Sequence, residues 1–340
     1  MDINPASINK LKNNHFSALN ILKSWEFLLF ILLAIVLLMD FFLSPQLFTI
    51  NNLLAATNAF MERSIIAIPL ALIIITGYID ISVSSIAALT GVTLGVLWQA
   101  GIPLWLSILI GIVVGTLGGF INGIVAAKLK IPSLVVTLST LILYRGICYI
   151  LLGDNAVRDL PKSFGYFGGA YKLLVIPNSL IIFVILAIIF GLILHFTTFG
   201  RSIYAIGNNE NAARYSGIPV DKIRIILYTI TGFISAIAGV LVTSRINSAR
   251  PDIAEGAEMA VITIVLLGGV MITGGKGSIP GVVLSAFLIG FIQYTLRLIN
   301  IQEVVISIVT GGLLIFALLI PRFNEVINDI RRRSDFMKSN

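Results

Sequence analysis

The sequence predicts an all-α, polytopic membrane protein. Of its 340 residues, 57% are hydrophobic and only 11% are charged, whereas soluble domains carry about 25% charged residues. So few charges cannot cover a water-exposed surface, and we therefore expect lipid to surround most of the chain. Several segments approach the roughly 20 apolar residues that a membrane-spanning helix needs. These apolar runs are too long for the strands of a membrane β-barrel.

The apolar segments define the domain organisation and the number of spans. We expect a cytoplasmic N-terminal segment over 1–25, a transmembrane domain over 26–321 that includes a polar loop at 200–223, and a basic cytoplasmic tail over 322–340. Lysines precede the first apolar run as in a signal sequence, but no small-residue cleavage site follows, so we interpret this run as a retained helix. About ten spanning helices are predicted, at 26–43, 54–76, 82–98, 103–127, 134–152, 175–197, 224–244, 257–272, 278–296 and 302–320.

Two of the ten segments are short. The apolar run from Ser64 to Ile75 has only 12 residues, or about 18 Å of helix, whereas the hydrocarbon core is about 30 Å thick. Either this helix continues back through Glu62 and Arg63, or it is broken inside the membrane. The segment 257–272 is also short and ends in glycines, and short, glycine-interrupted segments point to transport sites. Eight or nine spans are therefore an alternative to ten.

The basic residues orient the helices. With the N-terminus in the cytoplasm, the inner segments contain 15 lysines and arginines and the outer segments contain 7. This bias agrees with the excess of basic residues on the cytoplasmic side of membranes, so both termini are predicted to be cytoplasmic. The net charge of +7 follows from this sidedness and does not indicate nucleic-acid binding.

A polar island at 207–220 lies on the predicted cytoplasmic side between two apolar segments. Asn208 or Asn209 can cap a helix there, because a short side-chain oxygen accepts an unpaired backbone N–H. Glu210 then occupies the first turn, where the helix dipole favours an anion, and Gly217 suits the left-handed residue that follows a helix. The predicted helix of about two turns is unstable alone in water, so it packs against its own membrane domain or docks on a partner.

The island also carries a recognisable motif. Ala212 and Ala213, followed after three residues by Gly217, resemble the Ala-Ala-x-x-x-Gly loop of ABC importer permeases, and the flanking residues resemble the ribose, xylose and galactose type. In that family the loop forms a coupling helix that fits a cleft on the ATPase subunit. The resemblance implies these coupling residues: Gly207, Asn209, Glu210, Ala212, Ala213, Arg214, Ser216, Gly217 and Ile218.

Three more blocks resemble the same family, and together the four blocks cover about 52–321. Residues 76–84 are similar to its Thr-Gly-Gly-Ile-Asp-Leu-Ser-Val-Gly motif, with Tyr78 and Ser84 in place of glycines. A long central block and a glycine-rich block at 268–278 also match. Four blocks in the expected order make the resemblance specific for the family and much less specific for the solute.

The resemblance implies what the chain does and what it works with. It implies a permease subunit that passes a sugar or sugar-like solute across the bacterial inner membrane, with no catalytic residues and no cofactor of its own. A separate ATPase subunit would bind ATP, a periplasmic or extracellular binding protein would deliver the solute, and a second permease would complete a homodimer or heterodimer within the lipid. The outer loop at 152–168 most resembles permeases for rhamnose or autoinducer-2, and branched-chain amino acids and nucleosides are alternatives.

Polar residues within the apolar segments are candidates for the translocation pathway, because ionisable groups in membranes usually face a cavity or a partner. Asp80 either lines the pathway or caps the helix that starts near Ser82. Glu62 is a second pathway candidate, and Asn122 either makes an interhelical hydrogen bond or forms a gate. Arg145 is a candidate charge partner of Asp80 or Glu62. The predicted pathway residues are Asp80, Ser82, Ser84, Glu62, Asn122, Gly268, Gly269, Gly274 and Gly275.

Other kinds of site lack support. The run 274–278 does not have the spacing of a phosphate-binding loop, so we interpret its glycines as a turn between packed helices. One cysteine, Cys148, and two distant histidines, His15 and His195, predict no metal site. An ion-driven secondary transporter needs more ionisable relays, and an intramembrane enzyme needs a catalytic cluster. The aromatic residues of the loop 153–174 either form an interfacial belt or meet the binding protein.

Overall fold

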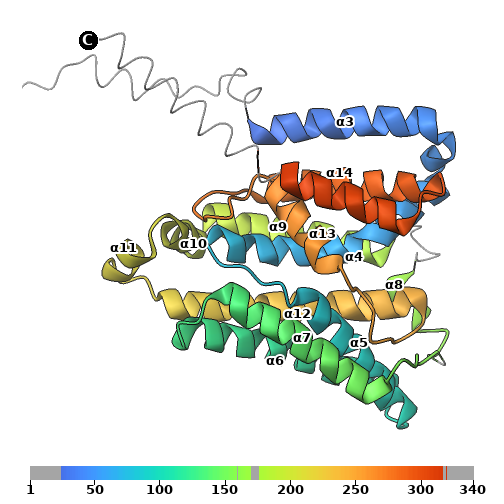
Figure 1. The fold of residues 1–340 in the computed structure, drawn as a ribbon, viewed down its shortest axis with the longest axis horizontal. Coiled ribbons are helices and arrows are strands. Elements are labelled where there is room, and N and C mark those ends of the chain that lie inside the picture. Colours follow the sequence, from blue (N-terminus) through green and yellow to red (C-terminus); the bar gives the residue numbers. More distant parts are fainter. Residues whose placement is uncertain (1–23, 159, 170–175, 317–318, 320–340) are drawn as a thin grey trace, which may run out of the picture.

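The described part of the protein is a bundle of helices (Figure 1). The computed structural model describes residues 24–158, 160–169, 176–316 and 319. Apart from an isolated bridge, these described residues contain no β-structure. The predicted all-α fold class is therefore confirmed. The predicted basic tail and nearly all of the predicted N-terminal segment lie outside the described residues.

Local capping explains where several helices begin. The side chains of Ser24, Thr49 and Ser278 each accept a hydrogen bond from a backbone N–H in the first turn of the helix that follows. In chain order the helices are α3 (Trp25–Leu43), the 3₁₀ turn η1 (Pro45–Phe48), α4 (Ile50–Ile75), α5 (Val83–Gln99), α6 (Leu104–Lys128), α7 (Ser133–Leu152), α8 (Gly165–Gly168), α9 (Asn178–Phe196), α10 (Thr198–Asn208), α11 (Glu210–Tyr215), α12 (Val220–Ile246), α13 (Ala257–Leu267) and α14 (Ile279–Leu298).

The structure supports fewer full-length spans than the sequence predicts. Seven of the described helices are long and apolar enough to cross a membrane: α3, α4, α6, α7, α9, α12 and α14. Shorter apolar helices occupy the other three predicted positions, namely α5, α13 and the helix Glu303–Phe316. With 11 residues, α13 is about 16 Å long and cannot cross a hydrocarbon core of about 30 Å. Each predicted segment contains a helix, but ten complete spans are not confirmed.

Helix α4 shows whether the first of the two short segments, Ser64 to Ile75, belongs to a continuous or a broken helix. It is continuous from Ile50 to Ile75 and passes through Glu62, so the broken-helix interpretation is wrong. The segment looked short because the first half of the helix carries polar residues that protein, rather than lipid, surrounds, among them Thr57 and Glu62. Pro69 lies within the helix without ending it, as membrane helices tolerate when neighbouring groups satisfy the freed carbonyl.

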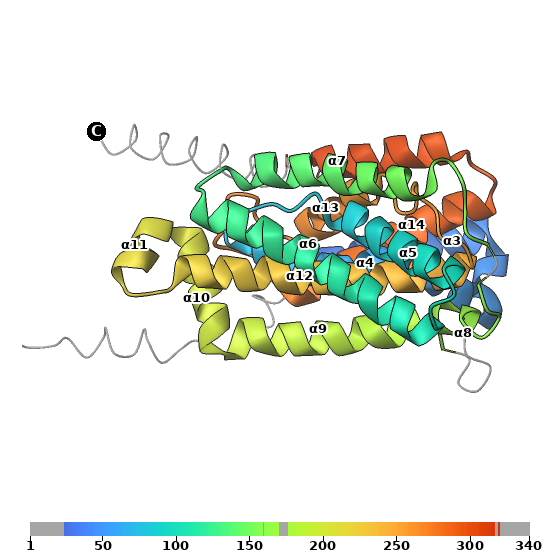
Figure 2. The same cartoon turned by 90° about the horizontal axis from the view of Figure 1, so that it is seen from below.

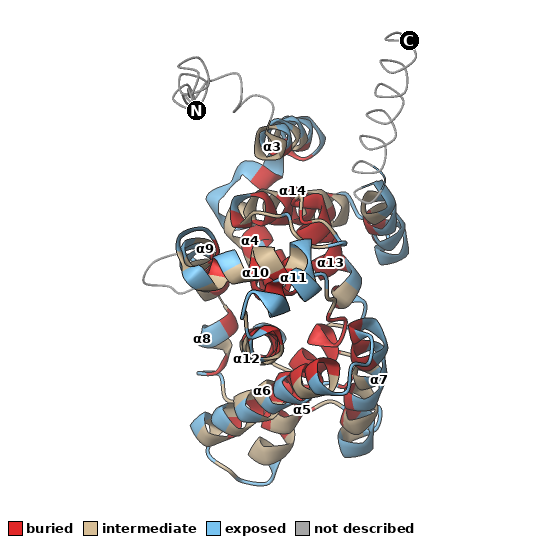
Figure 3. Ribbon diagram, turned by 90° about the vertical axis from the view of Figure 1, so that its left-hand side faces the viewer, coloured by how far each residue is buried: buried red, intermediate tan, exposed pale blue. Residues whose placement is uncertain are grey.

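The core of the bundle lies around α4 (Figure 2), and burial falls toward the periphery (Figure 3). Most of α4 is buried by α9, α12, α13 and α14, and α12 also packs against α5 and α6. In contrast, α3 packs on α14 at the edge of the bundle and exposes most of its apolar side chains. Exposing that apolar surface to water costs about 25 cal/mol per Å², so the periphery requires lipid as its solvent.

A helix precedes the polar island where the sequence predicted only loop. α10 begins after Thr197, whose hydroxyl accepts a hydrogen bond from a backbone N–H of its first turn. Its buried residues include Ile203 and Ile206, three positions apart on one helical face. This periodicity is visible in the sequence, but it spans only 11 residues, and glycines such as Gly200 and Gly207 resemble those of a loop. The connection at 200–223, for which one short helix was predicted, therefore contains α10 as well as α11.

Candidate functional site

The polar island folds as the short helix α11. The side chain of Asn209 accepts a hydrogen bond from the N–H of Ala212 at 3.0 Å and caps the helix. Gly217 follows the helix with φ of +81°, a left-handed conformation that glycine adopts at little cost. The predicted helix with an asparagine cap and a terminal glycine is confirmed. Asn208 does not cap α11; its side chain donates to the carbonyl of Tyr204 at 3.0 Å, at the end of α10.

Helix α11 projects from one end of the bundle, beyond the start of α12 (Figures 1 and 2). Ala213 is its buried residue. Tyr215 is 93% exposed, and Ala212, Arg214 and Ser216 are also exposed. A short helix therefore turns one side toward the bundle and presents an aromatic, a charged and two small side chains on the other.

A cluster of polar and charged residues joins α11 to the bundle. One carboxylate oxygen of Glu210 lies 2.8 Å from the guanidinium of Arg214 and 3.0 Å from that of Arg224. The other oxygen accepts a hydrogen bond from the hydroxyl of Tyr78. Arg214 also pairs with Asp221 at 2.5 Å, and its hydrogen bonds to Asp221 and Glu210 raise the pKa of Arg214 further above its usual range. Each of the four charged side chains thus lies beside an opposite charge.

Arg224 is the buried member of this cluster, with a side chain that is 7% exposed. It donates to the carbonyl of Ala126 at 3.2 Å and to the hydroxyl of Tyr78. Its guanidinium carbon lies 3.7 Å from the centre of the Tyr78 ring, within the range of a cation–π contact. Because burial of an unpaired charge is costly, Glu210 and Tyr78 stabilise Arg224 in this position. A cavity of about 590 Å³ opens beside the cluster, toward Lys130.

The glycine-rich turn between α13 and α14 packs against the end of α10 and the end of α4. The N–H of Gly275 donates to the carbonyl of Ile75, the last residue of α4, at 2.8 Å. A side chain at Gly207 would overlap both the carbonyl of Ile75 and the backbone of Gly275. Gly274 lies against the backbone of Ile75, Gly77 and Gly207. The structure therefore places Gly274 and Gly275, which were predicted for the pathway, next to the end of α10, the helix that precedes α11.

The other two glycines of the predicted pathway lie at a different place. Gly268 packs against Gly281 of α14, and Gly269 lies against the side chain of Trp25 in α3. The indole N–H of Trp25 donates to the carbonyl of Leu267 at 2.9 Å. These two glycines thus join the end of α13 to α14 and α3.

Asp80 lies at the centre of a buried hydrogen-bond network in the connection between α4 and α5. One oxygen of Asp80 accepts hydrogen bonds from the N–H and the hydroxyl of Ser82, at 2.9 and 2.6 Å. Asn122 of α6 donates to the Ser82 hydroxyl at 2.7 Å, and the Tyr144 hydroxyl of α7 lies 3.3 Å from the Asn122 carbonyl oxygen. Asp80, Ser82 and Asn122 are each fully buried. The interhelical hydrogen bond predicted for Asn122 is present.

Two polar atoms beside this network lack a partner. Among the described residues, neither the second carboxylate oxygen of Asp80 nor the hydroxyl of Ser84 has a hydrogen-bond partner. Buried polar atoms normally find one. Asp80 thus binds Ser82, the residue before α5, and does not cap α5, which has no side-chain cap. Its second oxygen is still able to accept a hydrogen bond.

Sequence comparison decides what kind of protein carries these sites. The family described as "Branched-chain amino acid transport system / permease component" matches residues 52–318. The chain belongs to this permease family. The autoinducer 2 import system permease proteins LsrD of Salmonella typhimurium and Escherichia coli (strain K12 / DH10B) are each 38% identical to this permease, over 86% of its chain and 90% of theirs. No solved structure matches the permease.

Family membership confirms the resemblance that the motifs indicated. The permease is the membrane-spanning component of an ABC import system and a multi-pass protein of the bacterial inner membrane. The prediction of a non-catalytic permease subunit is supported by the same family. The more specific likeness to rhamnose permeases finds no support in these relatives.

Two charged residues of the permease have partners that the sequence did not predict. Glu62, which is 3% exposed, binds Arg245 of α12 through both carboxylate oxygens, at 2.6 and 2.9 Å. Arg145 donates to the backbone carbonyls of Pro251 and Ile253, at 2.5 and 2.8 Å. The predicted pairing of Arg145 with Asp80 or Glu62 is therefore wrong, because the loop after α12 reaches α7 and offers carbonyl oxygens to its guanidinium.

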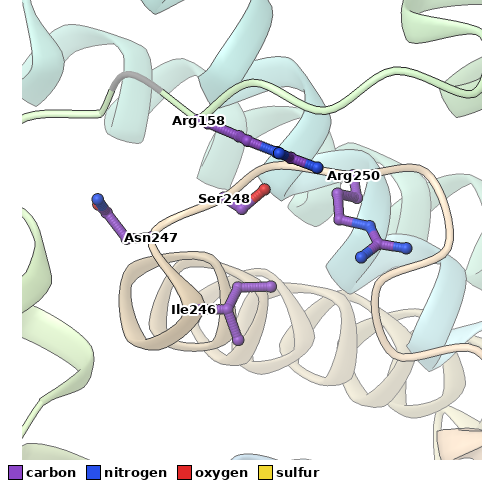
Figure 4. Close-up of a pocket in the computed structure, with 5 residues that line it drawn as sticks. All are labelled: Arg158, Ile246, Asn247, Ser248 and Arg250. Carbon is purple, nitrogen blue, oxygen red and sulfur yellow. The ribbon is translucent and has the colours of Figure 1, made fainter.

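The end of the permease opposite α11 carries a polar pocket of about 420 Å³ (Figure 4). Arg158 reaches it from the segment before α8, while Asn247, Ser248 and Arg250 come from the segment after α12. Arg250 pairs with Asp252. Among the described residues, the side-chain amide oxygen of Asn247 and the hydroxyl of Ser248 are buried without a hydrogen-bond partner. This end of the molecule therefore holds polar groups that its own described chain does not satisfy.

The aromatic residues of the loop near α8 divide into two kinds. Phe164 is fully buried, so neither the belt nor the binding-protein interpretation applies to it. Tyr166 and Phe167 are each 53% exposed and fit both interpretations. Tyr171 lies outside the described residues.

Three residues of the site were not singled out by sequence. Tyr215 lies between the motif positions and carries no signal of its own. Arg224 adds to the count of basic residues, and only the structure shows that it is buried. Tyr78 stands where the family has glycine, and that departure is the available signal for its contact with Glu210.

Proposed function

We propose that this permease imports a sugar-like solute, with autoinducer-2 as the first candidate. The names of the relatives support this choice, since all of the relatives described above are autoinducer-2 import permeases and the match covers most of both chains. Branched-chain amino acids are the second candidate, favoured by the description of the family. The ion-driven alternative does not fit a permease of this family.

We propose that an ATPase subunit docks on α11, and the projecting helix itself is the observation that carries this proposal. Tyr215 is 93% exposed, and tyrosine is one of the residue types enriched at the hot spots of protein interfaces. A six-residue helix is too short to be stable by itself in water, but the Asn209 cap and the Glu210 cluster hold it in shape. The coupling helix is thus presented in a preformed conformation, which lowers the entropic cost of docking.

We propose the following arrangement in the membrane. The end that carries α11 faces the cytoplasm, with both chain termini, as the bias of basic residues requires. The end with the Arg158 pocket then faces the binding protein that delivers the solute. The shorter helices α5 and α13 lie within the bundle as partial spans. A second permease, identical or related, completes the dimer, and ATP and all cofactors belong to the ATPase subunits.

We propose that solute passes near the Asp80 network when the helices around it rearrange. Asp80 and Ser84 each keep an acceptor that is free among the described residues, and a polyhydroxylated solute can donate hydrogen bonds to both. ATP binding and hydrolysis by the docked subunits would alternate the opening of the two ends, as in other transporters that move as rigid bodies about a central site. No covalent step takes place in the permease.

Co-purification tests the docking proposal. The permease is expressed with its ATPase, and the ATPase retained per permease is measured after purification in detergent. We expect Tyr215→Ala combined with Ala212→Arg to reduce retention at least tenfold, because both changes fall on the exposed side of α11. Trp105→Ala is the matched control, since Trp105 is 68% exposed at the other end of the bundle. Equal retention by wild type and the α11 variant, with uptake that survives ATP depletion, would contradict the proposal.

A further inference from the structure

We propose that Tyr78 is a positioning residue that transmits movement of α11 to the buried Asp80 network. The proposal rests on the proposed role of α11 as the docking helix and adds a route by which a displacement of α11 reaches the inside of the bundle. This route runs from α11 through the connection between α4 and α5 to Asn122 of α6.

Helix α11 is attached to the bundle mainly by polar contacts. Ala213 is its buried residue, so apolar packing anchors it weakly. The cavity of about 590 Å³ lies between the cluster and the turn near Lys130, which leaves space on that side of the helix. A firm connection from α11 to the residues before α5 is the hydrogen bond from the Tyr78 hydroxyl to Glu210.

Tyr78 holds both partners of the Glu210–Arg224 pair. Its hydroxyl donates to Glu210 and accepts from Arg224, and its ring lies under the guanidinium of Arg224 at 3.7 Å. Glu210 belongs to α11, whereas Arg224 lies in the first turns of α12. A displacement of α11 therefore pulls on Tyr78 unless the charge pair separates, and separation would leave Arg224 buried without its carboxylate.

The backbone next to Tyr78 is held from two sides. The carbonyl of Ile79 accepts from the Tyr228 hydroxyl of α12 at 3.0 Å. The N–H of Ile79 donates to the Ser133 hydroxyl of α7 at 3.2 Å. Because both of its backbone groups are hydrogen-bonded, Ile79 can act as a pivot. A displacement of the Tyr78 side chain therefore moves Asp80 instead of being absorbed by a flexible loop.

The residue after that pivot is Asp80, whose carboxylate holds Ser82 and, through Ser82, the side chain of Asn122. Four elements therefore meet over five residues of chain: α11 at Tyr78, α7 and α12 at Ile79, and α6 beyond Asp80. A chain of this kind couples two sites only if each link has fixed partners. Here Tyr78, Ile79 and Asp80 are joined by the backbone, and each contact with another element is a hydrogen bond between buried or half-buried groups.

Tyr78→Phe tests the route, because it removes a single oxygen and leaves the ring on Arg224. The permease, its ATPase and its binding protein are reconstituted together in proteoliposomes, and solute uptake and ATP hydrolysis are measured in parallel. We expect the ATPase to remain bound and the ATP hydrolysed per solute imported to rise about five- to tenfold. This change lies at the lower end of the fold-changes that allosteric coupling commonly produces. Tyr149→Phe is the matched control, since Tyr149 is 39% exposed on the face of α7 and no hydrogen bond of its hydroxyl is seen in the described part.

A second measurement separates this proposal from the docking proposal. Spin labels at Asn211→Cys and Lys128→Cys, in a Cys148→Ala background, report the distance between α11 and α6 in the permease without any partner. We expect a narrow distance distribution in the parent protein, a broader one with Tyr78→Phe or Glu210→Gln, and no change with Tyr149→Phe. An unchanged distribution and an unchanged ATP-to-solute ratio in Tyr78→Phe overturn the role of Tyr78. Failure of the parent protein to retain any ATPase instead overturns the docking role of α11 while the distance result stands.

Discussion

The two ends of α12 carry the same chemistry in different settings. Arg224 near its start pairs with Glu210, and Arg245 near its end pairs with Glu62. Glu62 lies in the middle of the 26-residue helix α4 and is 3% exposed, whereas the Glu210 side chain lies on a six-residue helix and is 35% exposed. The pair at the far end joins two long, packed helices. The pair near α11 joins a long helix to a small one that has little apolar packing.

This difference separates a structural ion pair from one that connects moving parts. A buried pair between packed helices contributes little while intact, but its loss leaves a buried charge. In the pair near α11 the arginine is the buried member, at 7% exposed, so loss of Glu210 also leaves a buried charge, and this pair in addition fixes the position of a weakly packed helix. We therefore expect changes at the α11 end to affect function as well as stability, and changes at the Glu62 end to affect mainly stability.

The largest loss of stability is expected from Arg245→Ala. The substitution leaves Glu62, whose side chain is 3% exposed, without its cation, and we expect the free energy of unfolding in detergent micelles to fall by about 3 kcal/mol. Glu303→Ala is the control, because its pair with Arg297 is largely exposed and should be worth less than about 1 kcal/mol. Equal losses in the two variants would show that Glu62 is not held in a dry interior.

A smaller loss is expected from Asn122→Ala, which breaks the link from Ser82 to α6. Removing one partner of a buried hydrogen bond should lower the free energy of unfolding by about 1–2 kcal/mol. Thr116→Ala on the same helix serves as the control, since its hydroxyl bonds to the carbonyl of Ile112 within α6. If both variants are equally stable, the Asp80 network does not hold α6 in place.

At the α11 end, Glu210→Gln keeps a hydrogen-bond acceptor for Arg224 but removes the negative charge beside a buried guanidinium, so we expect the free energy of unfolding to fall by about 1–2 kcal/mol and α11 to loosen. Hydrogen exchange of the backbone amides at 210–216 is expected to accelerate about fivefold, because local opening of α11 no longer separates an ion pair. Asp252→Asn, which weakens the pair with Arg250 at the opposite end, should leave those amides unaffected. Unchanged exchange in Glu210→Gln would mean that the cluster does not hold α11.

The smallest effect is expected from Arg158→Ala. Arg158 is an exposed residue beside the polar pocket, and surface substitutions of this kind usually change stability by no more than about 0.5 kcal/mol. Thermal unfolding in detergent should therefore match that of the wild type. A loss above 1 kcal/mol would reveal that the arginine supports the fold and would make the two ends more alike than the structure indicates.

Local signals in the sequence predicted much of the site. The asparagine cap, the glycine after the helix and the acidic first turn of α11 depend on neighbours in the chain, so they could be recognised directly. The apolar runs likewise placed a helix at each predicted span. Helix α10 was missed because its periodic apolar face is short, and the length of α4 was uncertain because hydropathy does not show whether a polar residue faces lipid or protein.

The sequence by itself determined the membrane setting, the all-α class, the polar island with its capped helix, and the family. Those properties follow from composition and from residues close together in the chain. Only the tertiary structure decided the partners of the charged groups: Glu62 with Arg245, Arg145 with backbone carbonyls, and Glu210 with Tyr78 and Arg224. Tyr78 and Arg224 are 146 positions apart, and a charge meets such a partner only after the helices have packed, because electrostatic pairing depends on distance in space and carries no periodic signal along the chain.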